Sequence, residues 1–311
     1  MSAKSEGGGP QVTRFSVIAL LALIFAVITV VMGGIVRITG SGLGCPDWPL
    51  CHGNLIPPWE MAPWLEYMHR LSASLAGIST IFLLVISIRT FKFRHRITKI
   101  AAIVTVLLLI QAALGAYTVL SELSPLIAIV HTAVGISYVA ILVLILSVTN
   151  KSSWKNSENL NEKNKKELKT QALILSVVTF FLLMSGTYVT RTLGSPSACM
   201  SFPMCGTPIQ EMTSIHWIHM SHRLISLLAI LILGSTVIKS LHLGIPAVKG
   251  IMYLLVTLLT IQVILGLGNV ILRLPSEIRA MHVAVGILFF TTTVFLAAKL
   301  WQEKILGVKS T

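Results

Sequence analysis

The chain has 311 residues, of which 54% are hydrophobic and only 11% are charged, and its mean hydropathy is +0.84. Soluble globular proteins carry roughly 25% charged residues. This composition therefore excludes a soluble enzyme, a disordered protein and a nucleic-acid-binding domain, and it leaves a polytopic membrane protein.

Long apolar gaps between charged residues predict eight membrane helices, since each span needs about 20 mostly apolar residues. The bracketing charges lie at 14–37, 70–89, 99–122, 122–151, 169–191, 223–239, 249–273 and 279–299. The apolar run of the first gap is too long for a signal peptide and no small-residue cleavage site follows it, so we expect a retained helix. The second and sixth gaps are short, so their helices should begin earlier, near Glu66 and His216. Both helices would then carry ionisable residues inside the membrane, where such residues are usually functional.

The distribution of Lys and Arg predicts the orientation in the membrane. Of the 24 basic residues, 18 fall on one side, in both terminal segments and in every second loop. The remaining six are balanced by six acids on the other side, so the net charge of +13 belongs entirely to the first side. By the positive-inside rule, both termini are cytoplasmic. The basic excess is thus a topology signal, and we expect no nucleic-acid partner.

The second half of the chain repeats the first. Gly34-Ile-Val-Arg-Ile-Thr-Gly-Ser-Gly-Leu-Gly-Cys45 aligns with Tyr188-Val-Thr-Arg-Thr-Leu-Gly-Ser-Pro-Ser-Ala-Cys199, and further matching runs follow at offsets of 151–154 residues. Each half holds an even number of helices, so the copies have the same orientation. We predict an all-α fold of two tandem four-helix bundles related by a pseudo-twofold axis along the membrane normal. The bundles should span residues 1–150 and 170–311, with a solvated cytoplasmic linker at 151–169.

Four histidines occupy repeated positions near the outer ends of helices that run in the same direction. They are His69 and His131 in the first half, and His222 and His282 in the second. Two imidazoles that face each other across the core of a bundle are what bis-histidine haem ligation requires. A hydrogen-bonding role between helices is the simpler alternative for one histidine, but four paired and duplicated histidines favour haem. A zinc or copper site at His216, His219 and His222 is a further alternative.

The two halves differ at one ionisable position. Glu66 precedes His69 by one helical turn, and the second half has His219 at the corresponding place. A carboxylate beside a haem edge can polarise or deprotonate a group that is being oxidised, so the difference suggests one chemical site and one electron-carrying site. The alternative is an ion pair between Glu66 and Arg70, which the i,i+4 spacing allows.

Arginines and cysteines gather at the outer ends. Arg37, Arg70, Arg191 and Arg223 are candidates to bind haem propionates, because the guanidinium matches carboxylates, or to reach the lipid headgroups. Cys45 and Cys51 share one outer loop, and Cys199 and Cys205 share the other. In that oxidising compartment we expect one disulfide in each loop. The second disulfide is expected to be structural, and the first is either structural or redox-active.

These residues together resemble the haem A synthases of the bacterial type. The resemblance covers nearly the whole chain and rests on the eight helices, the repeated His-Arg helix starts, the paired loop cysteines and the Glu-x-x-His sequence at 66–69. It implies an oxidoreductase that converts the C8 methyl group of haem O to a formyl group by successive hydroxylations. It assigns catalysis to Glu66, the substrate haem iron to His69 and His131, and an electron-relaying haem b cofactor to His222 and His282.

The resemblance also implies a location and partners. The protein would lie in a bacterial cell membrane, surrounded by lipid, with both haem sites near the outer face. Haem O is the substrate, and haem O synthase and an oxidase assembly factor are candidate partners, while the electron donor and any homo-oligomer stay open. The main alternative function is a quinol-linked carrier with two haem b groups and no chemistry on haem. A transporter is disfavoured because the repeats are parallel and no proline breaks a helix at mid-depth.

Overall fold

The computed structural model describes residues 10–149, 161–244, 246–302 and 305. Within these ranges the chain is helical, and its β structure is one isolated bridge between Cys51 and Asn54. Eight helices are long and apolar enough to cross a membrane. In chain order they are α1 (Pro10–Ile38), α2 (Met61–Phe91), α3 (Arg96–Leu120), α4 (Pro125–Thr149), α5 (Glu162–Arg191), α7 (Ser214–Leu243), α8 (Pro246–Ile271) and α9 (Ser276–Leu300). The predicted all-α fold with eight membrane helices is confirmed.

The ends of the helices follow local sequence signals. Three helices begin with proline, whose missing N–H and fixed φ suit the first helical turn: α1, α4 and α8. Helix α7 ends at Gly244, which adopts the left-handed conformation typical of a helix C-terminus. Helices α2 and α7 begin at Met61 and Ser214, so both take their ionisable residues into the span as expected.

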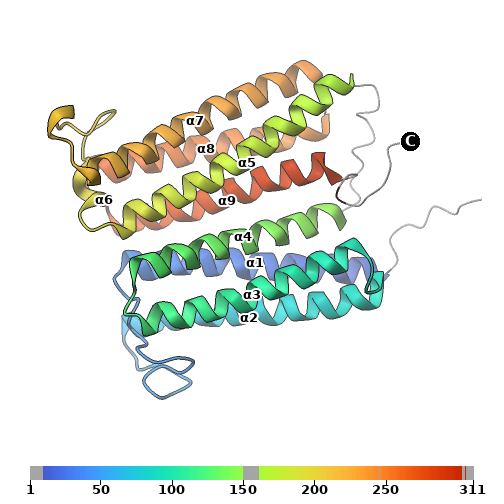
Figure 1. Cartoon of the computed structure of the whole chain (residues 1–311), viewed down its shortest axis with the longest axis horizontal. Helices are drawn as coiled ribbons and strands as arrows, with labels where there is room; N and C mark the ends of the chain where they lie inside the picture. The colour runs from blue at the N-terminus through green and yellow to red at the C-terminus, as the bar shows by residue number, and fades with distance from the viewer. Residues whose placement is uncertain (1–9, 150–160, 245, 303–304, 306–311) are drawn as a thin grey trace, which may run out of the picture.

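The helices form two rings of four (Figure 1). In the first ring, α1 contacts α2 and α4, and α3 completes it by contacting the same two helices. In the second ring, α5 contacts α7 and α9, and α8 again joins the other two. The equivalent helices of the two halves therefore have equivalent neighbours, which is what tandem copies would give. The histidine-bearing helices, α2 with α4 and α7 with α9, lie diagonally opposite each other in their rings.

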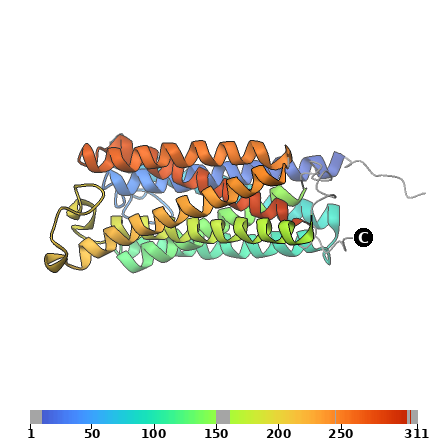
Figure 2. The same ribbon diagram turned by 90° about the horizontal axis from the view of Figure 1, so that it is seen from above.

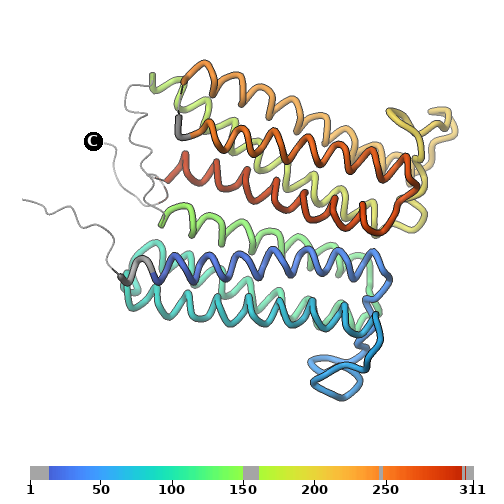
Figure 3. The backbone as a smooth tube through the Cα atoms, turned by 180° about the vertical axis from the view of Figure 1, so that it is seen from behind, coloured from blue at the N-terminus to red at the C-terminus, as the bar shows by residue number. Residues whose placement is uncertain are grey.

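Helix α9 joins the two rings, because it also packs against α1 and α4 (Figure 3). Its adjacent residues Phe289 and Phe290 enter different hydrophobic cores. Phe289 packs with α5, α7 and α8 residues such as Leu255, and Phe290 belongs to the core that contains Phe15 and Val139.

The two long loops, 39–60 and 192–213, leave the molecule at one end, hereafter the loop end (Figures 1 and 2). The second loop contains two short helical segments, α6 (Ser195–Ala198) and η2 (Ile209–Glu211). Helix α5 begins at Glu162, so residues 162–169 of the expected linker continue this helix, while 151–160 lie outside the described residues. Lys and Glu are good helix formers, and Asn161 caps the helix by accepting a hydrogen bond from the backbone of Lys163.

Candidate functional site: two histidine pairs and their loops

The four histidines lie at matching heights near the loop end. His69 and His222 are the ninth residues of α2 and α7, and His131 and His282 are the seventh residues of α4 and α9. Each is only partly exposed. The structure thus brings the predicted residues together in two pairs, one inside each ring.

The pair in the second ring has the spacing that a shared metal ion requires. The ring centroids of His222 and His282 are 6.5 Å apart. Metal–imidazole nitrogen bonds are about 2.0–2.1 Å long, so two nitrogens on opposite sides of one ion lie about 4 Å apart and the ring centroids somewhat farther. In the first ring, His69 is close enough to act electrostatically on His131.

Hydrogen bonds at Nδ1 of His69 and His222 leave the lone pair on Nε2 of these two histidines. His69 donates from Nδ1 to the carbonyl oxygen of Thr29 at 3.0 Å. His222 Nδ1 lies 2.9 Å from Ser185 Oγ, whose own proton goes to the Leu182 carbonyl, so the imidazole is the donor. A fixed Nδ1–H that orients Nε2 is the usual arrangement in histidine ligands.

Two glutamines complete the pairs. The side-chain amide nitrogen of Gln111 lies 3.4 Å from His131 Nε2, and that of Gln262 lies 3.2 Å from His282 Nε2. An amide nitrogen only donates, so Nε2 accepts and the proton is on Nδ1. Four buried atoms here have no hydrogen-bond partner among the described residues: Gln111 Oε1, His131 Nδ1, Gln262 Oε1 and His282 Nδ1. Native proteins rarely leave buried polar atoms unpaired, and such atoms are one sign of a ligand site.

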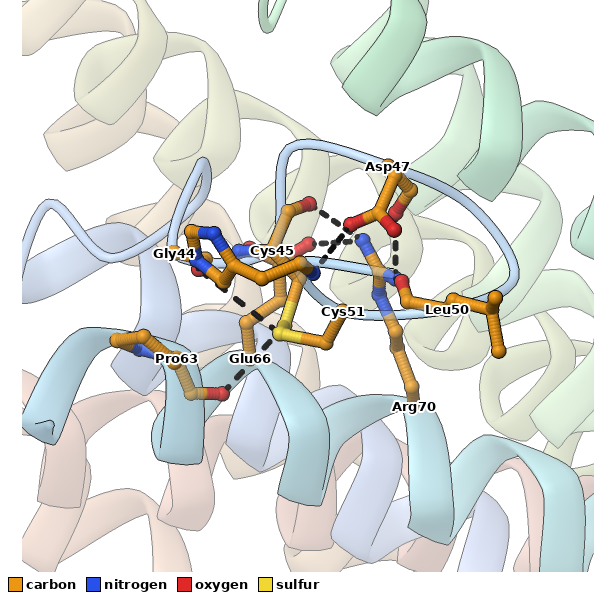
Figure 4. Close-up of polar contacts among 9 residues, drawn as sticks. Gly44, Cys45, Asp47, Leu50, Cys51, Pro63, Glu66 and Arg70 are labelled. Carbon is orange, nitrogen blue, oxygen red and sulfur yellow. Dashed lines mark hydrogen bonds and ion pairs between the residues drawn. A yellow bond between two sulfur atoms is a disulfide. The ribbon is translucent and has the colours of Figure 1, made fainter. Parts of the chain in front are cut away.

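Glu66 binds the first loop (Figure 4). It is 3% exposed, its Oε1 forms an ion pair with Arg70 at 2.7 Å, and its Oε2 accepts from the backbone N–H of Cys45 at 3.0 Å. The ion pair considered from the i,i+4 spacing is therefore present. Arg70 also donates to three loop carbonyls, those of Cys45, Asp47 and Leu50, each at 2.8 Å.

The second ring repeats this contact without an acid. Arg223 donates to four loop carbonyls, those of Cys199, Ser201, Pro203 and Met204. His219 occupies the position of Glu66, and its buried Nδ1 has no partner in the described part of the chain. An arginine alone therefore holds a loop of this kind, so the loop does not by itself require a carboxylate at residue 66.

The four arginines expected to bind propionates have different surroundings. The terminal nitrogens of Arg70 and Arg223 donate hydrogen bonds to loop carbonyls, whereas we expected them to bind haem propionates or to reach the lipid headgroups. A backbone carbonyl has no signature in the sequence, so this contact could not be predicted. Arg37 donates to the carbonyl of Thr190 at 2.7 Å, which links α1 to α5. The charge of Arg37 also acts on Arg191 and Arg279, so three cations gather at the loop end.

Both expected disulfides are present, Cys45–Cys51 and Cys199–Cys205. Asp47 shapes the first loop by accepting hydrogen bonds from the backbone N–H groups of His52 and Gly53, at 2.7 and 2.8 Å. These bonds, that from Gly53 above all, hold the pKa of the Asp47 carboxyl below its ordinary value. Asp47 was not predicted as a loop-shaping residue, although Asp in a loop that also contains Pro and Gly is a turn signal.

The metal alternative has no geometric support. Among the described residues, no group of three or more His, Cys, Asp or Glu side chains is placed to hold a metal ion. His216 instead caps α7, where its Nδ1 bonds the side chain and backbone of Thr213. The alternative of zinc or copper at His216, His219 and His222 is therefore not supported by the described residues.

Below the first histidine pair, a hydroxyl contact crosses the ring. Thr80 Oγ1 on α2 and Tyr138 Oη on α4 are 2.5 Å apart and buried. The equivalent residues of the second half, by the repeat offsets, are Leu233 and Phe289, which are both buried in its apolar core. The first ring is thus more polar than the second at two places, here and at Glu66.

Comparison with known proteins places these features in one family. The family model described as cytochrome oxidase assembly protein matches residues 16–294. Among relatives, the heme A synthase of Bacillus licheniformis is 34% identical over 219 residues, which cover 68% of this chain and 70% of the relative. That of Bacillus pumilus is 35% identical over 216 residues, covering 66% and 68%. That of Shewanella oneidensis is 27% identical over 333 aligned positions, covering 91% and 96%.

Proposed function

Because the chain belongs to the cytochrome oxidase assembly protein family, together with the heme A synthases that it resembles, we propose that it is an oxidoreductase that converts haem O into haem A. The observation that carries the proposal is the pair of opposed imidazoles in each ring. Two sites of one kind in one chain suit an enzyme that holds a haem substrate at one site and a haem cofactor at the other.

The residues present fit haem. The two imidazoles on diagonal helices of each ring would hold one haem iron between them, with Nε2 as the binding atom. The buried amide oxygens of Gln111 and Gln262 have no hydrogen-bond partner among the described residues, which leaves them available to a bound group. His222 and His282 would hold haem b, and His69 and His131 would hold haem O. Arg37 and Arg191 are the arginines that we propose for the propionates, since loop carbonyls occupy the other two.

The assignment of the substrate to the first ring rests on Glu66. The second ring holds its loop through Arg223 alone. We therefore infer that the carboxylate of Glu66 has a role other than holding the loop. We propose that it assists proton transfer as the C8 methyl group is oxidised. Two successive hydroxylations, each a two-electron oxidation of the carbon, would convert the methyl group first to an alcohol and then to a geminal diol, which loses water to give the formyl group. Bound haem would supply the iron-based oxidant for both steps, and the protein would supply position and electrostatics.

We also propose the orientation in the membrane. The loop end carries both disulfides, which form in oxidising compartments, and the opposite end carries the basic excess, which marks the cytoplasmic side. The termini would then be cytoplasmic and both histidine pairs would lie near the outer face of a bacterial cell membrane.

The first test identifies the bound haem. The protein is purified in detergent from a host that also makes haem O, and its non-covalent haem is extracted and identified by chromatography with mass spectrometry. We expect haem B together with haem O, a hydroxylated intermediate or haem A. Haem B alone, at two groups per chain, would instead support the alternative of a di-haem electron carrier, and no haem at all would contradict both.

The second test separates the role of Glu66 from that of the loop. The Glu66→Gln variant should retain haem O and haem B and should yield at least tenfold less haem A. Glu60→Gln is the matched control, because it makes the same change at the exposed carboxylate that immediately precedes helix α2, on which Glu66 lies. Normal haem A output from Glu66→Gln would refute the catalytic role.

A further inference from the structure

Each of the four histidines lies against a glycine of a neighbouring helix. A methyl group placed on that glycine would come within 3.0–3.4 Å of the imidazole carbon Cε1, which at three of the four positions is closer than side chains normally pack. The four contacts are Gly33 on α1 with His69 at 3.0 Å, Gly186 on α5 with His222 at 3.1 Å, Gly115 on α3 with His131 at 3.2 Å, and Gly266 on α8 with His282 at 3.4 Å.

Not every glycine within the membrane helices is packed in this way. A methyl group on Gly234 or Gly250 would meet no atom within 4 Å, and one on Gly77 would meet only the end of Leu108, at 3.7 Å. The close contacts at the histidines therefore do not follow merely from the presence of glycine in a helix.

In each ring, two contacts between a glycine and a polar side chain join the third and fourth helices. On α3, Gln111 precedes Gly115 by four residues, and on the antiparallel α4, His131 precedes Gly135 by four. The imidazole lies on Gly115, while the amide of Gln111 lies 2.8 Å from the position of a methyl group on Gly135. Helices α8 and α9 repeat the exchange, with Gln262 at 3.1 Å from the corresponding position on Gly286. The glycines let the two helices approach each other closely, and the close approach restricts each polar side chain to one position.

We propose that Gly33, Gly115, Gly186 and Gly266 are positioning residues that fix the direction in which each histidine presents Nε2. The carbon Cε1 lies between the two ring nitrogens, so a surface against it limits the tilt of the ring. The hydrogen bond at Nδ1 of His69 and of His222 then fixes the rotation. A β-carbon at the glycine moves the ring or separates the helices, and either change displaces Nε2 from the axis that it shares with its partner.

The proposal rests on the proposed haem function, and the test uses binding and spectroscopy in place of turnover. Gly186→Ala should lower the haem b content of the purified protein at least fivefold, or convert its low-spin optical and electron paramagnetic resonance signals to high-spin ones. Gly234→Ala on α7 is the matched control and should leave content and spectrum unchanged. Gly266→Ala, which adds a methyl group at an ordinary contact distance of 3.4 Å, should have the smallest effect of the four.

Haem bound in the unchanged ring shows that the chain has folded when a glycine of the other ring is substituted. Gly33→Ala should retain haem b in the second ring, which shows that the chain has folded, and should weaken haem O binding to the first ring at least tenfold in a spectroscopic titration. Wild-type haem content and unchanged spectra in folded Gly186→Ala and Gly33→Ala would overturn the proposal. Absence of haem from the wild-type protein would overturn the proposed function instead, so the two failures are distinguishable.

Discussion

The two loop-binding arginines allow the contribution of Glu66 to stability to be isolated. Each of Arg70→Met and Arg223→Met removes four hydrogen bonds of a guanidinium: three to loop carbonyls and one to Glu66 in the first case, and four to loop carbonyls in the second. They differ in one respect, because only Arg70 has a carboxylate among its four acceptors. Subtracting the effect of one variant from that of the other leaves the effect of the ion pair.

The structure sets the expected difference. Removing one partner of a buried ion pair costs about 3–5 kcal/mol, because it leaves an uncompensated charge. Glu66 is 3% exposed, but the Arg70 side chain is 16% exposed, so the lower end of this range applies. We expect Arg70→Met to destabilise the protein by about 3 kcal/mol more than Arg223→Met. In the double variant Glu66→Gln/Arg70→Met no charge is left behind, so most of the difference should disappear.

The measurement is unfolding in mixed micelles with increasing SDS, followed by circular dichroism with both disulfides intact. Four proteins are compared with the wild type: the two arginine variants, Glu66→Gln and the double variant. The reasoning is refuted if Arg70→Met and Arg223→Met shift the midpoint equally. It is also refuted if the double variant is no more stable than Arg70→Met, because the cost then does not come from the buried charge.

Three further predictions concern single contacts. Tyr138→Phe removes the buried hydrogen bond to Thr80 and should cost about 1 kcal/mol in the same unfolding assay; a fully apolar contact at this place is tolerated in the second ring, so a loss of fold would contradict the prediction. Replacing both cysteines of the second loop by serine should cost about 2 kcal/mol, as expected for a short closed loop, and an unchanged midpoint would show that the disulfide is not structural. The lowered pKa of Asp47 means that its carboxylate holds the Gly53 turn at all pH values above the ordinary 3.8 and releases it only as the pH falls below that value. Hydrogen exchange of the peptide around Asp47 should therefore show protection that is lost in acid, and Asp47→Asn should remove this pH dependence.

The fold could be predicted because its signals are local or repeated. The length of an apolar run determines a membrane helix, and the repeat offset aligned His69 with His222 and His131 with His282 before their positions in space were known. The start of α5 could not be predicted in this way. Residues 162–169 are polar, so hydropathy assigned them to the linker, although Lys and Glu favour a helix in water as well.

The candidate site could be predicted only in part, for a different reason. The sequence names side chains, but the partners of Arg70 and Arg223 are mostly backbone carbonyls, which every residue possesses. Two of the glycines beside the histidines, Gly115 and Gly266, stand in the repeated pattern Gln-x-x-x-Gly. Their meaning depends on which helix lies opposite, and a repeat does not give that information.

The position of α9 in both cores has a consequence for how the protein is made. This helix is the last of the eight to be synthesised, and domains generally form from the N-terminus during synthesis. Until α9 is present, the second ring is open between α5 and α8, His222 lacks the imidazole of His282, and Gly34 on α1 lacks the side chain of Val283 that packs against it. Closure of the second ring and completion of its histidine pair are therefore one late event in biogenesis, and the same event adds the contacts of α9 with α1 and α4 to the earlier contact between α4 and α5.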